Sequence, residues 1–178
     1  MKLFVVGYMA SGKTTFGKAL AEKLGTTFID LDQYIEEKSS KTISQIFLDL
    51  GEEGFRELEK EYLHNAVMSE PDAVIACGGG TPCFFDNMEF LNQQGITIFL
   101  ETSIPVLISR LIEENNKRPI MAGKSDDEIR QKVLSQLCDR LPHYLEAKMK
   151  WNGDDLNSPQ EIDANVENFI NSYPSLFR

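Results

Sequence analysis

Short apolar runs alternate along the chain with longer segments in which apolar residues recur at helical spacing. The short runs predict strands at residues 2–6, 27–29, 73–76, 96–100 and, with a weaker and more polar pattern, 148–151. The longer segments predict helices at residues 14–24, 33–38, 42–50, 52–68, 85–93, 104–114, 126–144 and 159–171. Residues 115–124 break the pattern with charges, Pro119 and Gly123, and they predict a mobile loop.

Strands that alternate with helices are typical of a parallel sheet with helices on both faces. We therefore expect a three-layer α/β/α fold around a central parallel sheet of about five strands, in one domain that spans residues 1–178. Ligands of such folds bind at the carboxyl ends of the strands. Gly7, Asp30 and Gly78 lie at the ends of three predicted strands, so this edge of the sheet is the place to look for a site.

A glycine-rich loop follows the first predicted strand and leads into the first predicted helix. Residues 7–14 match G-x-x-x-x-G-K-[ST] at every fixed position. In this motif backbone N–H groups and a helix N-terminus surround a phosphate, the lysine reaches the β- and γ-phosphates, and the final hydroxyl ligates Mg²⁺. The alternative, a purely structural glycine turn, does not explain the strand-to-helix context. The candidate nucleotide-binding residues here are Gly7, Ala10, Ser11, Gly12, Lys13, Thr14 and Thr15.

This motif predicts a P-loop NTPase fold of the nucleoside monophosphate kinase type, but a nucleotide site does not name the reaction. Asp30 and Asp32 follow the second strand two residues apart. On an extended segment they would face opposite ways, one towards a metal and the other towards a substrate hydroxyl. The alternative for Asp32 is a helix N-cap.

Two arginines are candidates for gripping an anionic acceptor, because a guanidinium binds both oxygens of a carboxylate. Arg56 and Arg140 both lie in predicted helices. The alternatives are ion pairs along those helices, of Arg56 with Glu52 or Glu59 and of Arg140 with its acidic neighbours Asp139 or Glu146.

Three consecutive glycines, Gly78, Gly79 and Gly80, follow the buried strand at 73–76. They cost backbone entropy, and they make sense where a ligand must approach the backbone closely; a tight turn is the alternative. Arg118, in the predicted loop, has the character of a lid arginine that stabilises a transferring phosphoryl group, or else it is a solvated loop charge.

The net charge of −10, from 18 basic and 28 acidic residues, disfavours nucleic acid and anionic membranes as partners. If the ligands are anions, the six arginines must be concentrated where those ligands bind. The three cysteines lack metal-ligand spacing and indicate reduced thiols, and no stretch approaches the ~20 apolar residues of a membrane span. We expect a cytoplasmic protein and, in the absence of a large apolar surface stripe, a monomer.

Taken in order, the P-loop, D-x-D, G-E-x-x-F-R, G-G-G, R-P-x-x and R-x-x-x-Y motifs resemble the shikimate kinase family over nearly the whole chain. The resemblance implies transfer of a phosphate from MgATP to the 3-hydroxyl of shikimate. It also implies that residues 33–70 form an acceptor-binding helical region and that residues 115–124 form a mobile lid.

The resemblance assigns a role to each motif residue. Lys13, Asp32 and Arg118 would be catalytic, with Asp32 orienting the attacking hydroxyl. Thr14 and Asp30 would serve the metal. Arg56, Arg140 and the glycines 78–80 would bind shikimate, whereas Arg110 and Ser158 would lie at the adenine.

Three positions depart from the family pattern. Ala10 stands where the P-loop commonly has glycine, and alanine tolerates fewer backbone angles. Cys77 stands where a hydroxyl residue is frequent, and a thiol is a weak hydrogen-bonding group. Residues 152–157 match poorly, which affects the expected adenine contacts.

Several alternative functions stay open from the sequence. The nearest is another small-molecule P-loop kinase, acting on gluconate or a nucleoside monophosphate. A regulator that binds shikimate without turnover is disfavoured by the intact Lys13, Thr14, Asp32 and Arg118. A nucleic-acid-dependent ATPase is disfavoured because no basic stripe is present.

Overall fold

The computed structural model describes residues 1–114 and 125–177, and a five-stranded parallel sheet forms its centre. The strands occur in the order β2-β3-β1-β4-β5, and all four neighbouring pairs are parallel. Their bounds are β1 Lys2–Val6, β2 Thr27–Asp30, β3 Ala73–Ala76, β4 Ile96–Glu101 and β5 Met149–Asn152. All five predicted strands are confirmed, including the polar one at the edge.

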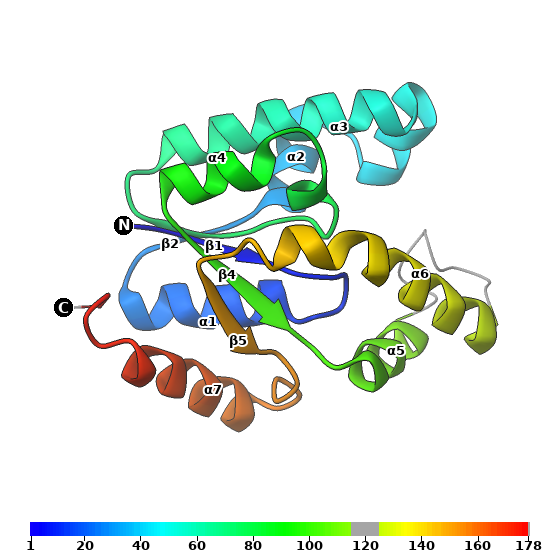
Figure 1. Ribbon diagram of the computed structural model, residues 1–178. Helices are drawn as coiled ribbons and strands as arrows, with labels where there is room; N and C mark the ends of the chain where they lie inside the picture. Colours follow the sequence, from blue (N-terminus) through cyan, green and yellow to red (C-terminus); the bar gives the residue numbers. More distant parts are fainter. Residues whose placement is uncertain (115–124, 178) are drawn as a thin grey trace.

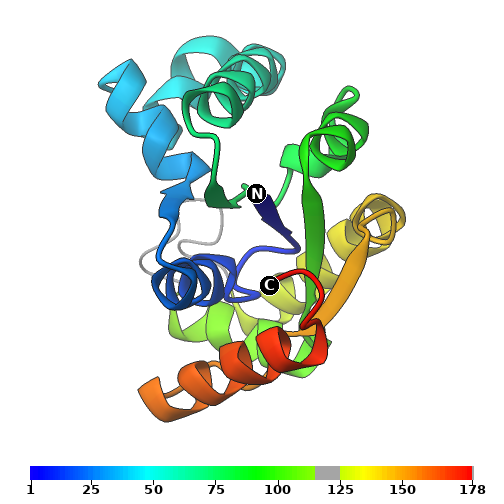
Figure 2. The same cartoon turned by 90° about the vertical axis from the view of Figure 1, so that its left-hand side faces the viewer.

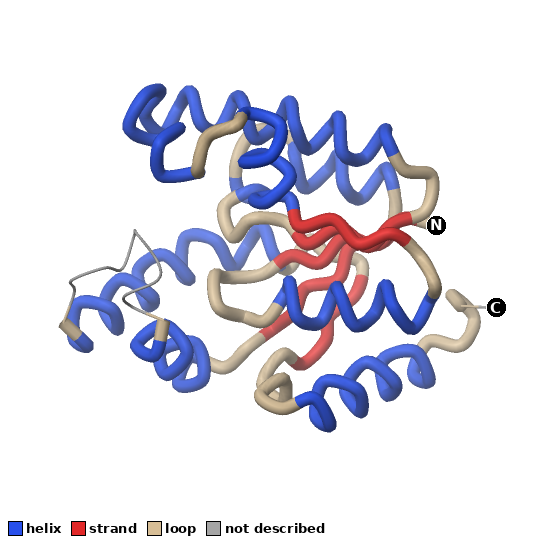
Figure 3. Tube along the Cα trace, turned by 180° about the vertical axis from the view of Figure 1, so that it is seen from behind, coloured by secondary structure: helices blue, strands red, loops and turns tan. Residues whose placement is uncertain are grey.

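Helices cover both faces of this sheet, which confirms the predicted three-layer architecture (Figures 1 and 3). The helices are α1 Lys13–Leu24, α2 Leu31–Ser39, α3 Ile43–Ser69, the short 3₁₀ turn η1 Thr81–Cys83, α4 Asn87–Gln94, α5 Ile104–Glu113, α6 Asp126–Tyr144 and α7 Pro159–Ser172. Figure 2 shows α7 on the opposite side of the sheet from α3. None of the helices within the described residues is long and apolar enough to cross a membrane.

The alternation of side chains along β1 explains the two cores. Leu3 and Val5 point to the face covered by α1 and α7, where they pack with Phe16 and Phe169. Phe4 and Val6 point to the other face, in the core that α3, α4 and α6 close. Because both faces are covered, the strand reads as a continuous apolar run in the sequence.

Helix α3 consists of two helical segments that meet at Gly51. The φ angle of Gly51 is 69°, outside the helical region, and the joint separates the two helices that the sequence predicts at 42–50 and 52–68. The first segment begins with a capping box between Thr42 and Gln45. The break allows the first segment to change direction, and it brings Ile43 and Phe47 to the edge of the acceptor cavity described below.

Three details differ from the prediction. Helix α2 begins at Leu31 rather than at residue 33. The turn η1 was not expected, and α4 begins at Asn87 rather than at residue 85, because Phe85 has a φ angle of 52° that a helix cannot contain. The predicted loop 115–124 lies outside the described residues.

Candidate active site

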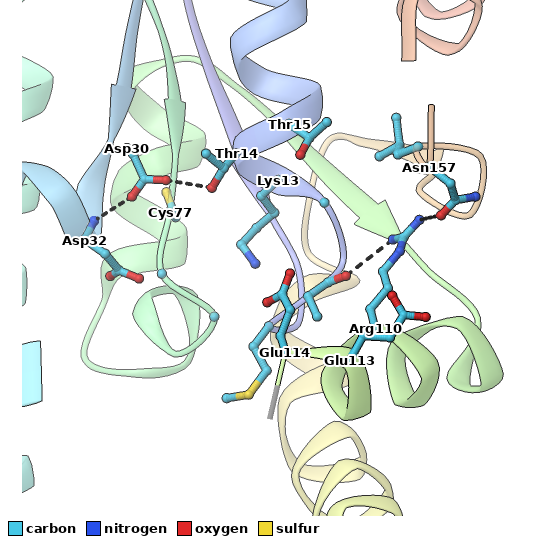
Figure 4. A pocket seen from close by; sticks show the side chains of 16 residues that line it. Lys13, Thr14, Thr15, Asp30, Asp32, Cys77, Arg110, Glu113, Glu114 and Asn157 are labelled. Atoms are coloured by element: carbon cyan, nitrogen blue, oxygen red, sulfur yellow. Dashed lines mark hydrogen bonds between the residues drawn. The ribbon is translucent and has the colours of Figure 1, made fainter. Parts of the chain in front are cut away.

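The carboxyl ends of β1, β2 and β3 meet at a cavity of about 420 Å³ (Figure 4). It is lined by residues of the glycine-rich loop, of the strand ends, and of α5 and the segment before α7: Met9, Ala10, Gly12, Lys13, Thr14, Thr15, Asp30, Asp32, Cys77, Gly78, Gly79, Arg110, Glu113, Glu114, Leu156 and Asn157. The cavity therefore lies where the sequence predicts a ligand site, and it gathers most of the predicted nucleotide-binding residues.

The glycine-rich loop has the tight geometry of a phosphate cradle. Gly7 has a φ angle of 148°, and a Cβ atom there would lie 2.8 Å from the Leu100 carbonyl oxygen. Gly12, with a φ angle of 96°, is the N-cap of α1, so the loop ends at a helix N-terminus with exposed N–H groups. The Lys13 ammonium group is buried and donates a 2.7 Å hydrogen bond to the Tyr8 carbonyl. An oxyanion in this cradle would meet both the backbone dipoles and a lysine charge.

Ala10 departs from the family pattern at a strained position. Its φ angle is 62°, in the left-handed region that alanine adopts only at a cost of about 1–2 kcal/mol. The loop thus keeps the glycine-type backbone conformation even though the side chain is alanine.

A hydrogen bond joins Thr14 and Asp30. The Thr14 hydroxyl donates a 2.6 Å hydrogen bond to Asp30 Oδ2. Asp30 Oδ1 accepts from the backbone N–H groups of Asp32 and Gln33, at 3.1 and 3.3 Å, and so caps α2. The N-cap is therefore Asp30, and the alternative reading of Asp32 as the cap is wrong. The expectation of an extended Asp30–Asp32 segment is also wrong, since α2 begins at Leu31.

The donor set suits a Mg²⁺ ion that keeps water and phosphate ligands. A hydroxyl and a carboxylate lie together at the cavity wall, and Mg²⁺ commonly takes one or two protein oxygens in such sites. Within the described residues no cluster of three or more His, Cys, Asp or Glu side chains could hold a metal by itself. The residues present fit a nucleotide-bound Mg²⁺ ion.

Asp32 has an unusual electrostatic environment. Asp32 is exposed to the solvent of the cavity, although the protein atoms around its carboxylate displace part of the water that would surround a free aspartate. Removal from bulk water, together with the nearby charges of Asp30 and Glu59, raises the pKa of Asp32 to about 6, although Lys13 and Arg56 oppose this. A carboxylate with this pKa is ionised at neutral pH and has an increased affinity for a proton.

A second cavity of about 130 Å³ opens beside the first. Met9, Asp32, Gly78 and Gly79 line both, so the two are adjacent. The further residues of the second cavity are Ile43, Phe47, Phe55, Arg56, Glu59, Gly80 and Arg140. It combines two guanidinium groups with apolar rings, as a small anionic ligand with a carbon skeleton requires.

Arg56 forms ion pairs with acidic residues of its own helix and also lines this cavity. Its Nη1 donates a 2.7 Å hydrogen bond to Glu59 Oε2, and its Nη2 lies 3.7 Å from Glu52 Oε1, so the predicted helical ion pairs are confirmed. Its guanidinium carbon lies 4.1 Å from the ring centroid of Phe84. The buried Arg56 Nε has no hydrogen-bond partner within the described residues.

Glu59 also lines this cavity, although the sequence indicates it only as an ion-pair partner of Arg56. Its carboxylate is 1% exposed and accepts from Arg56 and, at 2.6 Å, from the Thr81 hydroxyl. It fixes the guanidinium against the turn η1. The i, i+3 spacing from Arg56 is the signal that could have identified it.

Arg140 comes to the cavity from α6. Its guanidinium carbon lies 5.6 Å from the centroid of the Tyr8 ring, a cation–π contact between α6 and the glycine-rich loop. The sequence did not predict this contact, because it joins residues 132 positions apart.

The three glycines leave space for neighbouring groups, including charged side chains. This explains the choice of glycine by its lack of a side chain and not by its conformational freedom. A Cβ atom on Gly80 would lie 2.6 Å from Arg56 Nη2, and one on Gly78 would lie 2.8 Å from Asp32 Oδ1. A Cβ atom on Gly79 would lie 3.2 Å from the Met9 nitrogen. The protein's own side chains thus approach the backbone closely at Gly78 and Gly80, and the approach of a ligand to the triplet stays a prediction.

Arg110 binds the loops at the far end of the large cavity. It donates to the carbonyls of Ala10, Gly153 and Asp154, at 3.3, 3.1 and 2.8 Å, and to Asn157 Oδ1 at 3.1 Å. Ser158 caps α7 by accepting from Glu161 N–H, and the cavity wall there is formed by Leu156 and Asn157. The sequence prediction missed these two residues because 152–157 matches the family pattern poorly.

Two further positions that the sequence singles out are Cys77 and Arg118. Cys77 is buried at the end of β3 among carboxylates, and burial raises the pKa of its thiol far above the usual value, so the group stays neutral. Arg118 lies outside the described residues.

Comparisons with known proteins agree with this geometry. The family model described as shikimate kinase matches residues 9–171. A shikimate kinase from Phocaeicola vulgatus is 46% identical over 166 residues, which cover 93% of this chain and 94% of that protein. The crystal structure of shikimate kinase from Bacteroides thetaiotaomicron superposes with a TM-score of 0.93 at 44% identity, with 98% of each chain covered.

A solved structure of shikimate kinase from Acinetobacter baumannii in complex with shikimate has a TM-score of 0.84 and 32% identity, and it covers 98% of this chain and 93% of that one. Sequence, fold and the paired cavities lead to one conclusion: this chain belongs to the shikimate kinase family.

Proposed function

We propose that this protein transfers the γ-phosphate of ATP to the 3-hydroxyl of shikimate and releases shikimate 3-phosphate and ADP. The observation that carries the proposal is the adjacency of the two cavities. The cavity of the phosphate cradle lies beside a small cavity with two guanidinium groups, and Asp32 lines both. The relatives named above are shikimate kinases, and one of them was solved with shikimate bound.

The nucleotide side uses the glycine-rich loop. Lys13 and the N–H groups at the start of α1 bind the β- and γ-phosphates, and Thr14 with Asp30 holds Mg²⁺. When bound, the ion supplies positive charge that offsets the negative charge on the transferred group. Arg110 flanks the adenine, and Ser158 supports the adenine-binding segment through the start of α7.

The acceptor side uses the smaller cavity. Arg56 and Arg140 grip the carboxylate of shikimate, with Gly78, Gly79 and Gly80 close to the ring. The rings of Phe47 and Phe55 stack with centroids 4.3 Å apart and form an apolar wall.

Asp32 orients the attacking hydroxyl and accepts its hydrogen bond. The hydroxyl oxygen forms a bond to the γ-phosphorus, the bond from that phosphorus to the bridging oxygen of ADP breaks, and the hydroxyl proton passes to Asp32 or to solvent. Because the transition state of phosphoryl transfer is loose, positioning and charge contribute more than base strength. Arg118 is proposed as a lid residue that stabilises the transferred group; this rests on the sequence resemblance alone.

The wider organisation follows the same resemblance. We infer one kinase domain over residues 1–178, with residues 33–70 as the acceptor-binding region and residues 115–124 as a lid. The net charge of −10 supports a protein without nucleic-acid partners, and we infer a cytoplasmic monomer.

ADP formation in the presence of candidate acceptors tests the proposal. Purified protein with MgATP should form ADP rapidly with shikimate and only at background rates with gluconate or nucleoside monophosphates. Turnover with another acceptor but not with shikimate would retain the kinase and reject the substrate. Binding of ATP and shikimate without any turnover would instead favour the regulator.

A further inference from the structure

One face of α6 contacts both the glycine-rich loop and the glycine triplet. Gln136, Arg140 and Tyr144 follow one another at intervals of four residues, which places them on the same side of the helix. Gln136 Oε1 accepts a 2.8 Å hydrogen bond from the Tyr8 hydroxyl, and Arg140 lies over the Tyr8 ring. The Tyr144 hydroxyl donates a 2.5 Å hydrogen bond to the Gly79 carbonyl oxygen.

The Tyr144 side chain is held rigidly at this junction. It is fully buried, and its ring stacks on Phe99 with centroids 5.3 Å apart. Burial raises the pKa of the hydroxyl far above its usual value, so the hydroxyl keeps its proton and acts as a donor to Gly79. The Arg140 guanidinium and the Cys83 thiol lie near the same hydroxyl and affect its pKa in opposite directions.

The hydrogen bond from Tyr144 to Gly79 fixes the peptide group between Gly79 and Gly80. Neither glycine has a side chain whose contacts could fix it. Glycine residues have wide conformational freedom, so a loop of three glycines can change its peptide orientation readily. Because the peptide between Gly79 and Gly80 is planar and trans, holding the Gly79 carbonyl directs the Gly80 N–H to the opposite side from Tyr144. Within the described residues this N–H donates to no protein acceptor.

We propose that Tyr144 is a positioning residue for the acceptor, whose hydroxyl holds the Gly79 carbonyl oxygen. It thereby sets the shape of the glycine loop that lines the smaller cavity. The inference rests on the proposed function, since it assigns to shikimate the cavity that Tyr144 organises.

Substitution of Tyr144 by Phe removes one oxygen atom and keeps the ring that stacks on Phe99. The shikimate KM should rise about five- to tenfold, which corresponds to the loss of one ordinary hydrogen bond, while the ATP KM stays within about twofold. Titration calorimetry with shikimate alone should give a matching loss of affinity. Tyr173→Phe serves as the control, because Tyr173 packs on Phe169 and Trp151 beside α7, in the core on the other side of the sheet.

Two results would overturn the inference. One is a Tyr144→Phe enzyme with an unchanged shikimate KM. The other is an equal rise in both KM values together with a lower Tm, because that pattern indicates a role only in the stability of the fold. Failure of the proposed function is recognised separately, since the unmodified protein would then turn over no shikimate at all.

Discussion

The hydroxyl of Thr14 donates a 2.6 Å hydrogen bond to Asp30 Oδ2 and so joins the first turn of α1 to the end of β2. The same carboxylate caps α2 through its other oxygen. Asp30 therefore has a structural role and a proposed metal role at once, and the two can be separated by substitution.

Asp30→Asn should weaken Mg²⁺ activation without loosening the fold. Asparagine caps a helix about as well as aspartate, so the Tm should stay near that of the unmodified protein. The Mg²⁺ concentration for half-maximal activity should rise about tenfold or more, because a charged group that orients or binds the ion is lost. Activity measured across a Mg²⁺ series checks this.

Asp30→Ala is the matched comparison. It removes the charge and the cap together, and the lost cap of about 1 kcal/mol should lower the Tm by about 2–4 °C. An Asp30→Asn enzyme with an unchanged Mg²⁺ requirement would show that Asp30 serves only the helix.

The two guanidinium groups should respond differently to removal. Arg140→Ala should raise the shikimate KM about 10- to 100-fold, as expected for lost hydrogen bonds to a charged group, with little change in the ATP KM. Arg56→Ala should raise the shikimate KM as well and in addition destabilise the protein by about 3 kcal/mol or more, because Glu59 would remain as an unpaired buried charge.

Thermal unfolding and steady-state kinetics of both variants check this difference. A second change, Glu59→Gln on Arg56→Ala, should restore part of the Tm but not the KM. Equal rises in the KM values of shikimate and ATP after loss of Arg140 would argue against its place in the acceptor cavity.

The pH dependence should report Asp32. Since its pKa is raised to about 6, kcat/KM for shikimate should fall as the pH decreases through 6, where the carboxylate becomes protonated. The stability of the protein should depend on pH in the opposite direction to the activity, because the folded state binds this proton more tightly than the unfolded chain does. The contribution of Asp32 to the stability of the ligand-free protein therefore grows as the pH falls through 6 towards 4.

Asp32→Asn tests both the predicted pH dependence of activity and the predicted pH dependence of stability. In the variant the residual kcat/KM should lose this acidic limb, and the ligand-free variant should have a higher Tm than the unmodified protein at pH 7 but not at pH 4. An identical acidic limb in both enzymes would assign that limb to another group.

Ala10→Gly should relieve strain in the glycine-rich loop. Ala10 has a φ angle of 62°, which costs alanine about 1–2 kcal/mol, and part of the gain is offset by the greater freedom of glycine in the unfolded chain. We expect a net rise in Tm of about 1–3 °C with ATP turnover retained. Ala164→Gly on the exposed face of α7 is the control and should lower the Tm, since glycine is about 1 kcal/mol worse in a helix. Equal decreases in both variants would contradict strain at Ala10.

The periodic parts of the fold could be predicted from sequence because burial on both sheet faces leaves continuous apolar runs, as in β1. The break at Gly51 was also predictable, since glycine ends a helical pattern. The start of α2 was not: Asp30 and Asp32 are equally good caps by residue type, and the hydrogen bond of Thr14 to Asp30 leaves no signal in the sequence.

The anchoring of the acceptor cavity depends on contacts between distant parts of the chain. The contact of Arg140 with the Tyr8 ring and the hydrogen bond of Tyr144 to Gly79 leave no periodic pattern in the sequence. The sequence therefore predicts Arg140 as a ligand-binding residue but does not predict these contacts. The approach of a ligand to the glycine triplet stays a prediction, whereas the protein's own side chains approach the backbone closely, Arg56 at Gly80 and Asp32 at Gly78.

Identification of the reaction product tests the central claim most directly. Protein, MgATP and shikimate are incubated, and the product is examined by phosphorus–proton NMR correlation, with Lys13→Ala as the matched inactive variant. The account predicts a phosphate on the 3-oxygen of shikimate, formed together with one ADP, and a rate at least about 1,000-fold lower in the variant. Phosphate on another position, inorganic phosphate as the only product, or equal rates for the two proteins would contradict it.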